Sequence, residues 1–165
     1  MIRYAKKEDL DAIMEIVKIA KQYMKASGNL TQWAGDYPGK IDFEEDIRKK
    51  QLYVCYNDEM VYGVFAFVTE KDPNYAYIED GQWFNEEPYG TIHRIAGNGK
   101  VKGVFQEAVS FAKEKMDNLR IDTHEDNRTM RHLIEKSGFQ RCGIVYMEDG
   151  SPRIAYQYAA NGGEK

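Results

Sequence analysis

Three glycines and two lysines are concentrated between residues 97 and 103, in a segment that could bind phosphate groups. The run reads Gly97-Asn98-Gly99-Lys100-Val101-Lys102-Gly103. A helical pattern follows it, and the first turn of a helix leaves several backbone N–H groups without intrahelical partners at the positive end of its dipole. Glycines let the backbone approach a ligand, and lysines add mobile positive charge. The segment therefore predicts a site for a phosphate or pyrophosphate group.

The spacing of these glycines excludes two familiar nucleotide-binding motifs. A P-loop requires Lys and then Ser or Thr after its second glycine, whereas Gly103 is followed by Val104 and Phe105. The dinucleotide-binding fingerprint also fails, because the third glycine comes one position too late. On the glycines alone, a tight turn that binds no ligand is the alternative interpretation.

His93, shortly before this turn, is the first candidate for a general base. Imidazole groups titrate near neutral pH, so they can take a proton from an attacking nucleophile. In a strand over residues 90–96, simple alternation places His93 on the same face as Thr91 and Ile95. A purely structural histidine is the alternative interpretation.

Apolar residues at regular spacing predict the elements that must position these groups. Residues 52–56 and 61–68 should pair as a hairpin, and a run at 75–78 should continue this antiparallel meander. Asp42 and Glu45 are expected to form a capping box. Strands are expected at 2–4, 52–56, 61–68, 75–78, 90–96, 119–123, 140–147 and 152–158. Helices are expected from residue 10 to about 27, over 43–50, over 101–116 and after residue 127.

Composition bounds the class of protein. The 165 residues include 42% hydrophobic and 30% charged residues, which favours one globular α/β domain over residues 1–160 with a loose tail at 161–165. The net charge of −4 argues against nucleic-acid binding. No apolar run is long enough to span a membrane and no secretory leader is recognisable, so a cytoplasmic protein without a membrane partner is expected.

The cysteines and histidines do not indicate a metal site. Cys55 and Cys142 are far apart in the sequence and are expected to be small buried side chains. The three histidines add no ligand spacing, so no metal is expected.

The order of these elements resembles the GNAT superfamily of N-acetyltransferases over nearly the whole chain. The run Lys100-Val101-Lys102-Gly103-Val104-Phe105 is similar to the family's coenzyme A pyrophosphate motif, Gln/Arg-x-x-Gly-x-Gly/Ala, with Phe105 in place of the small last residue. Residues 122–130 followed by Gly138-Phe139 resemble its strand-to-helix segment. The runs 93–96, 120–124 and 142–146 are similar to a bacterial subgroup of the small-molecule type.

The resemblance implies a mixed sheet with an antiparallel N-terminal meander, a parallel pair at the fourth and fifth strands, and flanking helices. It also implies that acetyl-CoA is the co-substrate and that its pantetheine arm lies between the two diverging parallel strands. The backbone of Ile95 and Gly97 would bind the arm and the acetyl carbonyl, residues 100–105 would bind the pyrophosphate, and Asn127 would reach the arm from the other side. A plain helix cap is the alternative role of Asn127.

The acceptor site and the proton donor follow from the same resemblance. The family builds its acceptor site where this chain has Gln32, Trp33 and Tyr37. Trp83 and Tyr89 are expected to close its other side, and core packing is the alternative for all five aromatic and amide side chains.

Many GNAT enzymes place a thiolate-protonating tyrosine seven residues after the capping asparagine, where this chain has Ile134. Tyr146 is the first candidate to replace it, although Cys142 or unassisted departure are alternatives. Glu79 and Asp80 could replace His93 as base by acting through water.

The expected function is transfer of an acetyl group from acetyl-CoA to a primary amine by direct attack. The acceptor would be a small molecule or a peptide, and the enzyme a monomer or a homodimer. A non-catalytic acyl-CoA-binding sensor or regulatory module is the alternative, and a nucleotide-binding regulator is the third possibility.

Overall fold

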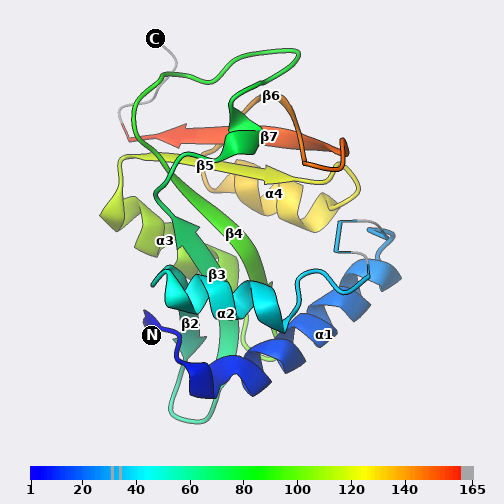
Figure 1. Ribbon diagram of the computed structural model, residues 1–165, viewed down its shortest axis with the longest axis vertical. Coiled ribbons are helices and arrows are strands. Elements are labelled where there is room, and N and C mark those ends of the chain that lie inside the picture. Colours follow the sequence, from blue (N-terminus) through cyan, green and yellow to red (C-terminus); the bar gives the residue numbers. More distant parts are fainter. Residues whose placement is uncertain (31, 34, 161–165) are drawn as a thin grey trace. The chain divides into compact units, whose positions relative to one another are not determined.

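The computed structural model describes residues 1–30, 32–33 and 35–160, and within them seven strands form one mixed sheet. The strands follow the hydrogen-bonding order β1-β2-β3-β4-β5-β7-β6 (Figure 1). The strands are β1 Ile2–Tyr4, β2 Leu52–Tyr56, β3 Val61–Val68, β4 Gly90–Gly97, β5 Asn118–Thr123, β6 Gln140–Tyr146 and β7 Pro152–Ala159. The helices are α1 Leu10–Ala26, α2 Lys40–Arg48, α3 Val104–Lys115 and α4 Arg128–Lys136. The predicted tail at 161–165 lies outside the described residues.

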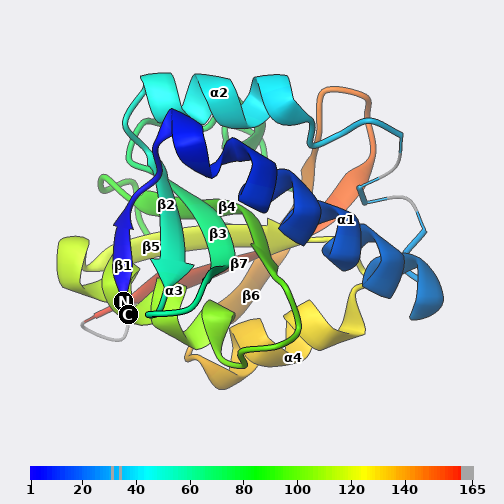
Figure 2. The ribbon, with the colours of Figure 1, turned by 90° about the horizontal axis from the view of Figure 1, so that it is seen from below.

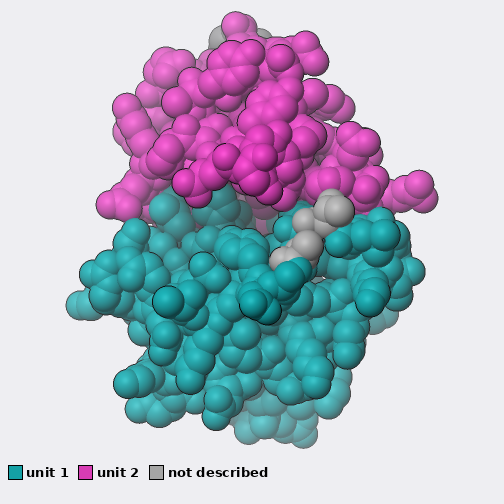
Figure 3. Space-filling model, turned by 45° about the vertical axis from the view of Figure 1, so that its right-hand side comes forward, with its two compact units in different colours: residues 1–68, 92–108 teal, residues 69–91, 109–165 magenta. Residues whose placement is uncertain are grey.

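The chain divides into two compact units, which Figure 3 distinguishes by colour. The first unit contains Met1–Val68 and Ile92–Ala108, and the second contains Thr69–Thr91 and Val109–Lys165. Strand β4 and helix α3 therefore each contribute residues to both units.

In the first unit, helices α1 and α2 lie side by side over strands β2 and β3 (Figure 2). The apolar stripe of α1 is buried, as its three- and four-residue spacing predicts. Strands β2 and β3 form the expected antiparallel hairpin, with Tyr53 opposite Phe65. The core of this unit includes Ile13, Val17, Phe43, Leu52, Val54 and Val64.

Two predicted helix starts were wrong. Helix α2 begins at Lys40 because the Asp42 carboxylate accepts the N–H of Gly39 at 2.7 Å, so Asp42 occupies the third helical position instead of the cap. Helix α3 begins at Val104, since Gly103 adopts a left-handed conformation (φ 91°) that a helix cannot contain.

In the second unit, β5 and β6 each pair antiparallel with β7, and α4 covers one face of these strands (Figure 1). The expected parallel pairing of β4 and β5 is confirmed at Gly90–Leu119 and Thr91–Arg120. Ile134, which follows the capping asparagine by seven positions, belongs to α4 and is fully buried.

The strand predicted at 75–78 was wrong. Asp72 accepts the N–H of Asn74 at 2.9 Å and starts a short 3-10 helix at Pro73–Tyr75 instead. Farther on, Glu79 exchanges two backbone hydrogen bonds of 2.8 Å with Ile144 on β6.

Glycines permit this approach of the 79–81 segment to β6. A Cβ atom at Gly81 would lie 1.8 Å from the carbonyl oxygen of Cys142, and one at Gly143 would lie 2.6 Å from that of Glu79. The backbone of Glu79 is thus fixed on β6 by geometry that larger residues cannot adopt.

None of the helices in the described ranges combines the length and apolar character that crossing a bilayer requires.

Candidate functional site

Strand β4 carries an irregularity at Arg94, next to the predicted base His93. Arg94 has a left-handed backbone (φ 51°), whereas a regular strand residue is extended. Residues 93–95 are all half-buried, so two-residue alternation cannot relate Ile95, which follows Arg94, to Thr91 and His93, which precede it. A left-handed residue inside a strand re-aims the backbone N–H and C=O groups beside it, and we refer to this irregularity at Arg94 as the β4 bulge.

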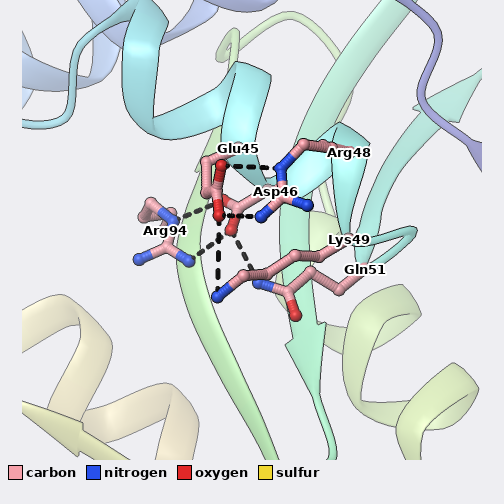
Figure 4. A network of polar contacts seen from close by, with 6 residues as sticks. All are labelled: Glu45, Asp46, Arg48, Lys49, Gln51 and Arg94. Atoms are coloured by element: carbon pink, nitrogen blue, oxygen red, sulfur yellow. Dashed lines mark hydrogen bonds and ion pairs between the residues drawn. The ribbon is translucent and has the colours of Figure 1, made fainter.

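A buried carboxylate on α2 holds the Arg94 side chain (Figure 4). The Arg94 Nε and Nη2 atoms donate to Asp46 at 2.6 and 2.8 Å, in the bidentate geometry that suits arginine. The Asp46 side chain is only 3% exposed. Gln51 donates a third hydrogen bond to the same carboxylate at 2.8 Å. The carboxylate is therefore well satisfied although it is removed from water.

The electrostatics of Arg94 follow from this partner. Burial alone would lower the pKa of the guanidinium, but the hydrogen bonds and charge of Asp46 outweigh that effect, with a smaller contribution from Tyr37. The net result is a pKa above the ordinary value for arginine. Arg94 is thus a permanent cation at the bulge.

Arg94 also reaches the loop between α1 and α2, where the acceptor residues were predicted. Its Nη1 atom donates to the Tyr37 hydroxyl at 3.2 Å, and 43% of Tyr37 is exposed. Trp33 packs on the core of the first unit, and Gln32 accepts a hydrogen bond from Asn29 at 3.1 Å. Of the three predicted acceptor residues, Tyr37 is thus joined directly to β4, and Trp33 has a packing role.

The Gly-rich turn after β4 is locally fixed. The Asn98 side chain accepts the N–H of Lys100 at 2.8 Å, and Gly99 has a positive φ of 79°. The Asn98 N–H donates to the Tyr62 carbonyl on β3 at 3.0 Å. Lys100 and Lys102 are exposed. Mobile cations therefore flank an ordered turn that leads into α3, an arrangement suited to a phosphate ligand.

Close packing favours glycine at positions 63 and 97. A Cβ at Gly97 would lie 3.0 Å from Val104 Cγ2, and one at Gly63 would lie 2.9 Å from both Val104 methyl groups. Phe105, which departs from the family motif, is 4% exposed, so its ring packs inward and does not cover the outer surface of the helix start. The turn and the start of α3 are thus seated directly on β3 and β4.

The predicted proton donor and the two alternative bases belong to the second unit. The hydroxyl of Tyr146, on β6, donates to the carboxylate of Glu79. This hydrogen bond, followed by partial burial, raises the pKa of Tyr146 above its ordinary value. The pair joins the predicted acid to one of the two alternative bases. Asp80, the other alternative, is exposed and has a left-handed backbone (φ 59°).

Asn127 caps α4, as the plain structural interpretation predicts. Its side-chain oxygen accepts the N–H of Met130 at 3.1 Å. The cap fixes the carbonyl side of the amide group, and the predicted contact with the pantetheine arm stays a prediction.

Burial makes both thiols poor acids. Burial raises the pKa of Cys142 to about 11 and that of Cys55 to about 12. Both residues are buried free cysteines, as predicted. Cys142 is only 7% exposed, whereas Tyr146 is half-buried, so the thiol is the less accessible of the two candidate proton donors.

Trp83 and Tyr89 have a structural explanation in the second unit. The Arg120 guanidinium lies 4.1 Å from the centre of the Trp83 ring system and 4.2 Å from that of Tyr89. Tyr89 is 6% exposed. Cation–π stacking and core packing account for both rings.

In the part of the chain that is described, no group of three or more His, Cys, Asp or Glu side chains is arranged so that it could hold a metal ion.

Sequence reasoning missed the Asp46–Arg94 pair. A signal was present, because Asp46 follows Phe43 by three residues and therefore shares its buried helix face. A carboxylate at such a position predicts a buried partner. The identity of that partner, 48 residues away, depended on the tertiary structure.

Comparison with solved structures identifies the family. An acetyltransferase of the GNAT family from Streptococcus agalactiae 2603 is 31% identical, with a TM-score of 0.87 over 96% of this chain and 94% of that one. A GNAT-family acetyltransferase from Listeria monocytogenes 4b F2365 is 19% identical, with a TM-score of 0.69 over 96% and 94% of the two chains. An N-acetyltransferase from Staphylococcus aureus Mu50 is 24% identical, with a TM-score of 0.60 over 97% and 98%.

No protein-family model and no curated protein sequence matches the chain. The near-complete match to the streptococcal protein is sufficient, and the chain belongs to the GNAT family of acetyltransferases. It is accordingly an acyltransferase, and the predicted fold is confirmed.

Proposed function

We propose that this enzyme transfers an acetyl group from acetyl-CoA to a primary amine of a small molecule or peptide by direct attack. The observation that carries the proposal is the left-handed bulge of β4 at Arg94, which is followed within a few residues by an ordered Gly-Lys turn and a helix start. The bulge suits a carbonyl oxygen, and the turn suits phosphates. One short segment of the first unit thus offers groups for both ends of acetyl-CoA.

In the proposed binding mode, backbone N–H groups of Ile95 and Gly97 contact the arm and the acetyl carbonyl. The N–H groups of Val101, Gly103, Val104 and Phe105 and the cations of Lys100 and Lys102 bind the pyrophosphate. Asn127 contributes its amide from the start of α4.

The reaction forms one bond and breaks one. The neutral amine nitrogen attacks the thioester carbonyl carbon, and the C–N bond forms while negative charge collects on the carbonyl oxygen. The C–S bond then breaks, and the thiolate of coenzyme A leaves. His93 takes the proton that the nitrogen loses, with Glu79 or Asp80 as the alternative through water, and Tyr146 supplies a proton to the thiolate.

We also propose that residues 1–160 act as one catalytic domain and that the reaction takes place in the cytoplasm. Gln32, Trp33 and Tyr37 are the proposed contacts of the acceptor amine. The exposed hydroxyl of Tyr37 supports this assignment most directly.

Calorimetric titration with coenzyme A tests the binding half of the proposal. Gly103→Asp should weaken binding about tenfold or more, because a carboxylate beside the helix start repels phosphates. Gly150→Asp is the matched control, since Gly150 also has a positive φ (85° against 91° for Gly103) and open space around its Cα. Equal affinities of the two variants would remove the turn from the site.

A thiol-release assay over a panel of amines tests the catalytic half. Wild-type enzyme should release coenzyme A from acetyl-CoA only when an acceptor is present. His93→Gln should then lower kcat/KM by about 100-fold or more with coenzyme A affinity retained. Binding without turnover on any amine in the panel would favour the sensor module over the transferase.

A further inference from the structure

One guanidinium group connects three parts of the first unit. Arg94 belongs to the bulge of β4, its Nε and Nη2 atoms are bound by Asp46 of α2, and its Nη1 atom donates to Tyr37 of the α1–α2 loop. The backbone whose shape matters for the acyl group and the loop proposed to receive the amine are therefore held by the same side chain.

The arrangement is costly enough to require an explanation. A non-glycine residue in a left-handed conformation is strained, and it persists only where its surroundings impose it. A buried ion pair is often no more stable than apolar residues of the same volume. Stability alone thus gives little reason to place both costs at one residue of β4.

A neighbouring ion pair provides the contrast (Figure 4). Glu45 and Arg48, also on α2, form an ion pair whose side chains are 48% and 69% exposed. Among the described residues, no hydrogen bond or ion pair joins that pair to β4 or to the α1–α2 loop. It is a solvent-exposed ion pair of the same helix, and such pairs contribute little to stability.

We propose that Arg94 is a positioning residue for acetyl transfer. Its ion pair with Asp46 holds the β4 bulge in the shape that presents backbone N–H groups of residues 95–97 to the acetyl carbonyl. Its contact with Tyr37 ties the amine-receiving loop to that same backbone. The inference rests on the proposed function, because it assigns a role in the reaction proposed above.

Coupling between the two substrates follows from this connection. An amine that orders Tyr37 also restrains Arg94, and through Arg94 it restrains the backbone that polarises the thioester. The carbonyl is then most strongly polarised when an acceptor is present. Such coupling favours transfer over wasteful hydrolysis of acetyl-CoA.

The test compares Arg94→Lys with Arg48→Lys. Lysine keeps the positive charge but lacks the planar fork that binds Asp46 through two atoms and Tyr37 through a third. Three quantities are measured: kcat and KM for the amine and for acetyl-CoA, the calorimetric affinity for coenzyme A, and the infrared band of the carbonyl in bound acetyl-CoA labelled with ¹³C. The band position reports hydrogen bonding to the acetyl oxygen, which a merely structural residue would not alter.

Arg94→Lys should lower kcat by about 10- to 100-fold, as expected when an oxyanion donor is misplaced. The carbonyl band should move toward its position in water, while the affinity for coenzyme A stays within about threefold of wild type. Arg48→Lys should match wild type in all three. Tyr37→Phe should raise KM for the amine and leave the carbonyl band of the binary complex unchanged.

A folded Arg94→Lys enzyme with wild-type kcat would overturn the proposal, and so would a lowered kcat with an unshifted carbonyl band. If Arg94→Lys does not fold, Asp46→Asn carries the same test, because the amide keeps the size of the carboxylate and loses its charge. If wild type binds acetyl-CoA with a carbonyl band shifted from its position in water but acetylates no amine, the proposed function fails. The positioning role of Arg94 is then still tested by comparing the band in wild type with that in Arg94→Lys.

Discussion

In each of the two units a strand of the sheet carries an arginine that is largely shielded from water, and the two charges are compensated in different ways. Arg94 in the first unit faces the Asp46 carboxylate, which keeps the pKa of the guanidinium above its ordinary value in spite of burial. Arg120 in the second unit is 5% exposed and has no carboxylate within ion-pair distance among the described residues. Burial lowers the pKa of Arg120, and the Tyr89 hydroxyl and the Glu86 charge offset this only in part.

The partners of Arg120 are aromatic faces and a backbone carbonyl. The guanidinium is flanked by Trp83 and Tyr89, and its Nη2 atom donates to the carbonyl of Asn85 at 2.8 Å. Through these contacts, the single side chain of Arg120 holds the irregular segment 69–89 against β5. The comparison indicates that Arg120 holds a loop against β5 through non-directional contacts. The carboxylate partner of Arg94, in contrast, fixes the orientation of the guanidinium group through two directional hydrogen bonds.

Removing the carboxylate from the first of these arginines should have the largest effect. Asp46→Ala leaves the buried Arg94 cation without its partner, and we expect a loss of about 3–5 kcal/mol in the free energy of unfolding. Urea denaturation measures it. Glu45→Ala, one residue earlier on the exposed face, is the control and should unfold at the wild-type midpoint. Similar losses of unfolding free energy in both variants would contradict the expectation that only the Asp46–Arg94 pair is important for stability.

Arg120→Met should cost less, because no buried opposite charge is left behind. The variant loses two cation–π contacts and one hydrogen bond, but it no longer carries the desolvation cost of a buried cation. We expect a net loss of about 1–2 kcal/mol in the free energy of unfolding. A loss larger than that of Asp46→Ala in the same urea experiment would reverse the comparison.

Replacing both members of the first pair should separate stability from activity. Asp46→Leu combined with Arg94→Met fills the same volume with apolar atoms, so the free energy of unfolding should return to within about 1 kcal/mol of wild type. Turnover should stay as low as in Arg94→Lys. Recovery of kcat together with stability would mean that the pair only supports the fold.

The smallest expected effect concerns a group of the second unit that titrates. Because the hydrogen bond to Glu79 raises the pKa of Tyr146, a basic limb of kcat that depends on this acid should lie above pH 10. Glu79→Gln removes the charge that disfavours the phenolate, so the limb should move to lower pH. Tyr146→Phe should abolish the limb. A pH profile that is identical in all three enzymes would exclude Tyr146 as the proton donor.

Local signals in the sequence predicted most of the fold. The spacing of apolar residues located α1, the β2–β3 hairpin and β4, and Asn127 was recognised as a helix cap. The error at residues 75–78 came from an apolar run in which only Tyr75 is buried, by aromatic contacts and not by strand pairing, whereas Tyr77 is 62% exposed. A periodicity of two residues cannot distinguish these two reasons for burial over so short a run.

The candidate site was harder to predict because its parts are distant in the chain. Motif similarity found the Gly-rich turn, which is a continuous segment. The position of the irregularity at Arg94 could not be predicted, since arginine is not a residue type that favours a left-handed conformation. The bond of Tyr146 to Glu79 depends on Gly81 and Gly143, whose role appears only when two backbones are seen in contact.

The division of β4 and α3 between the units constrains how this protein can be recombined. The chain passes from one unit to the other after Val68, after Thr91 and after Ala108. A single genetic crossover therefore splits at least one unit wherever it falls, and three crossovers are needed to exchange a unit intact. In a shuffled library made with a homologue, we expect folded chimaeras to be enriched for those triple exchanges. Arg94 and its partner Asp46 would then be inherited together, although they are 48 residues apart and the segment Thr69–Thr91 of the other unit lies between them in the sequence.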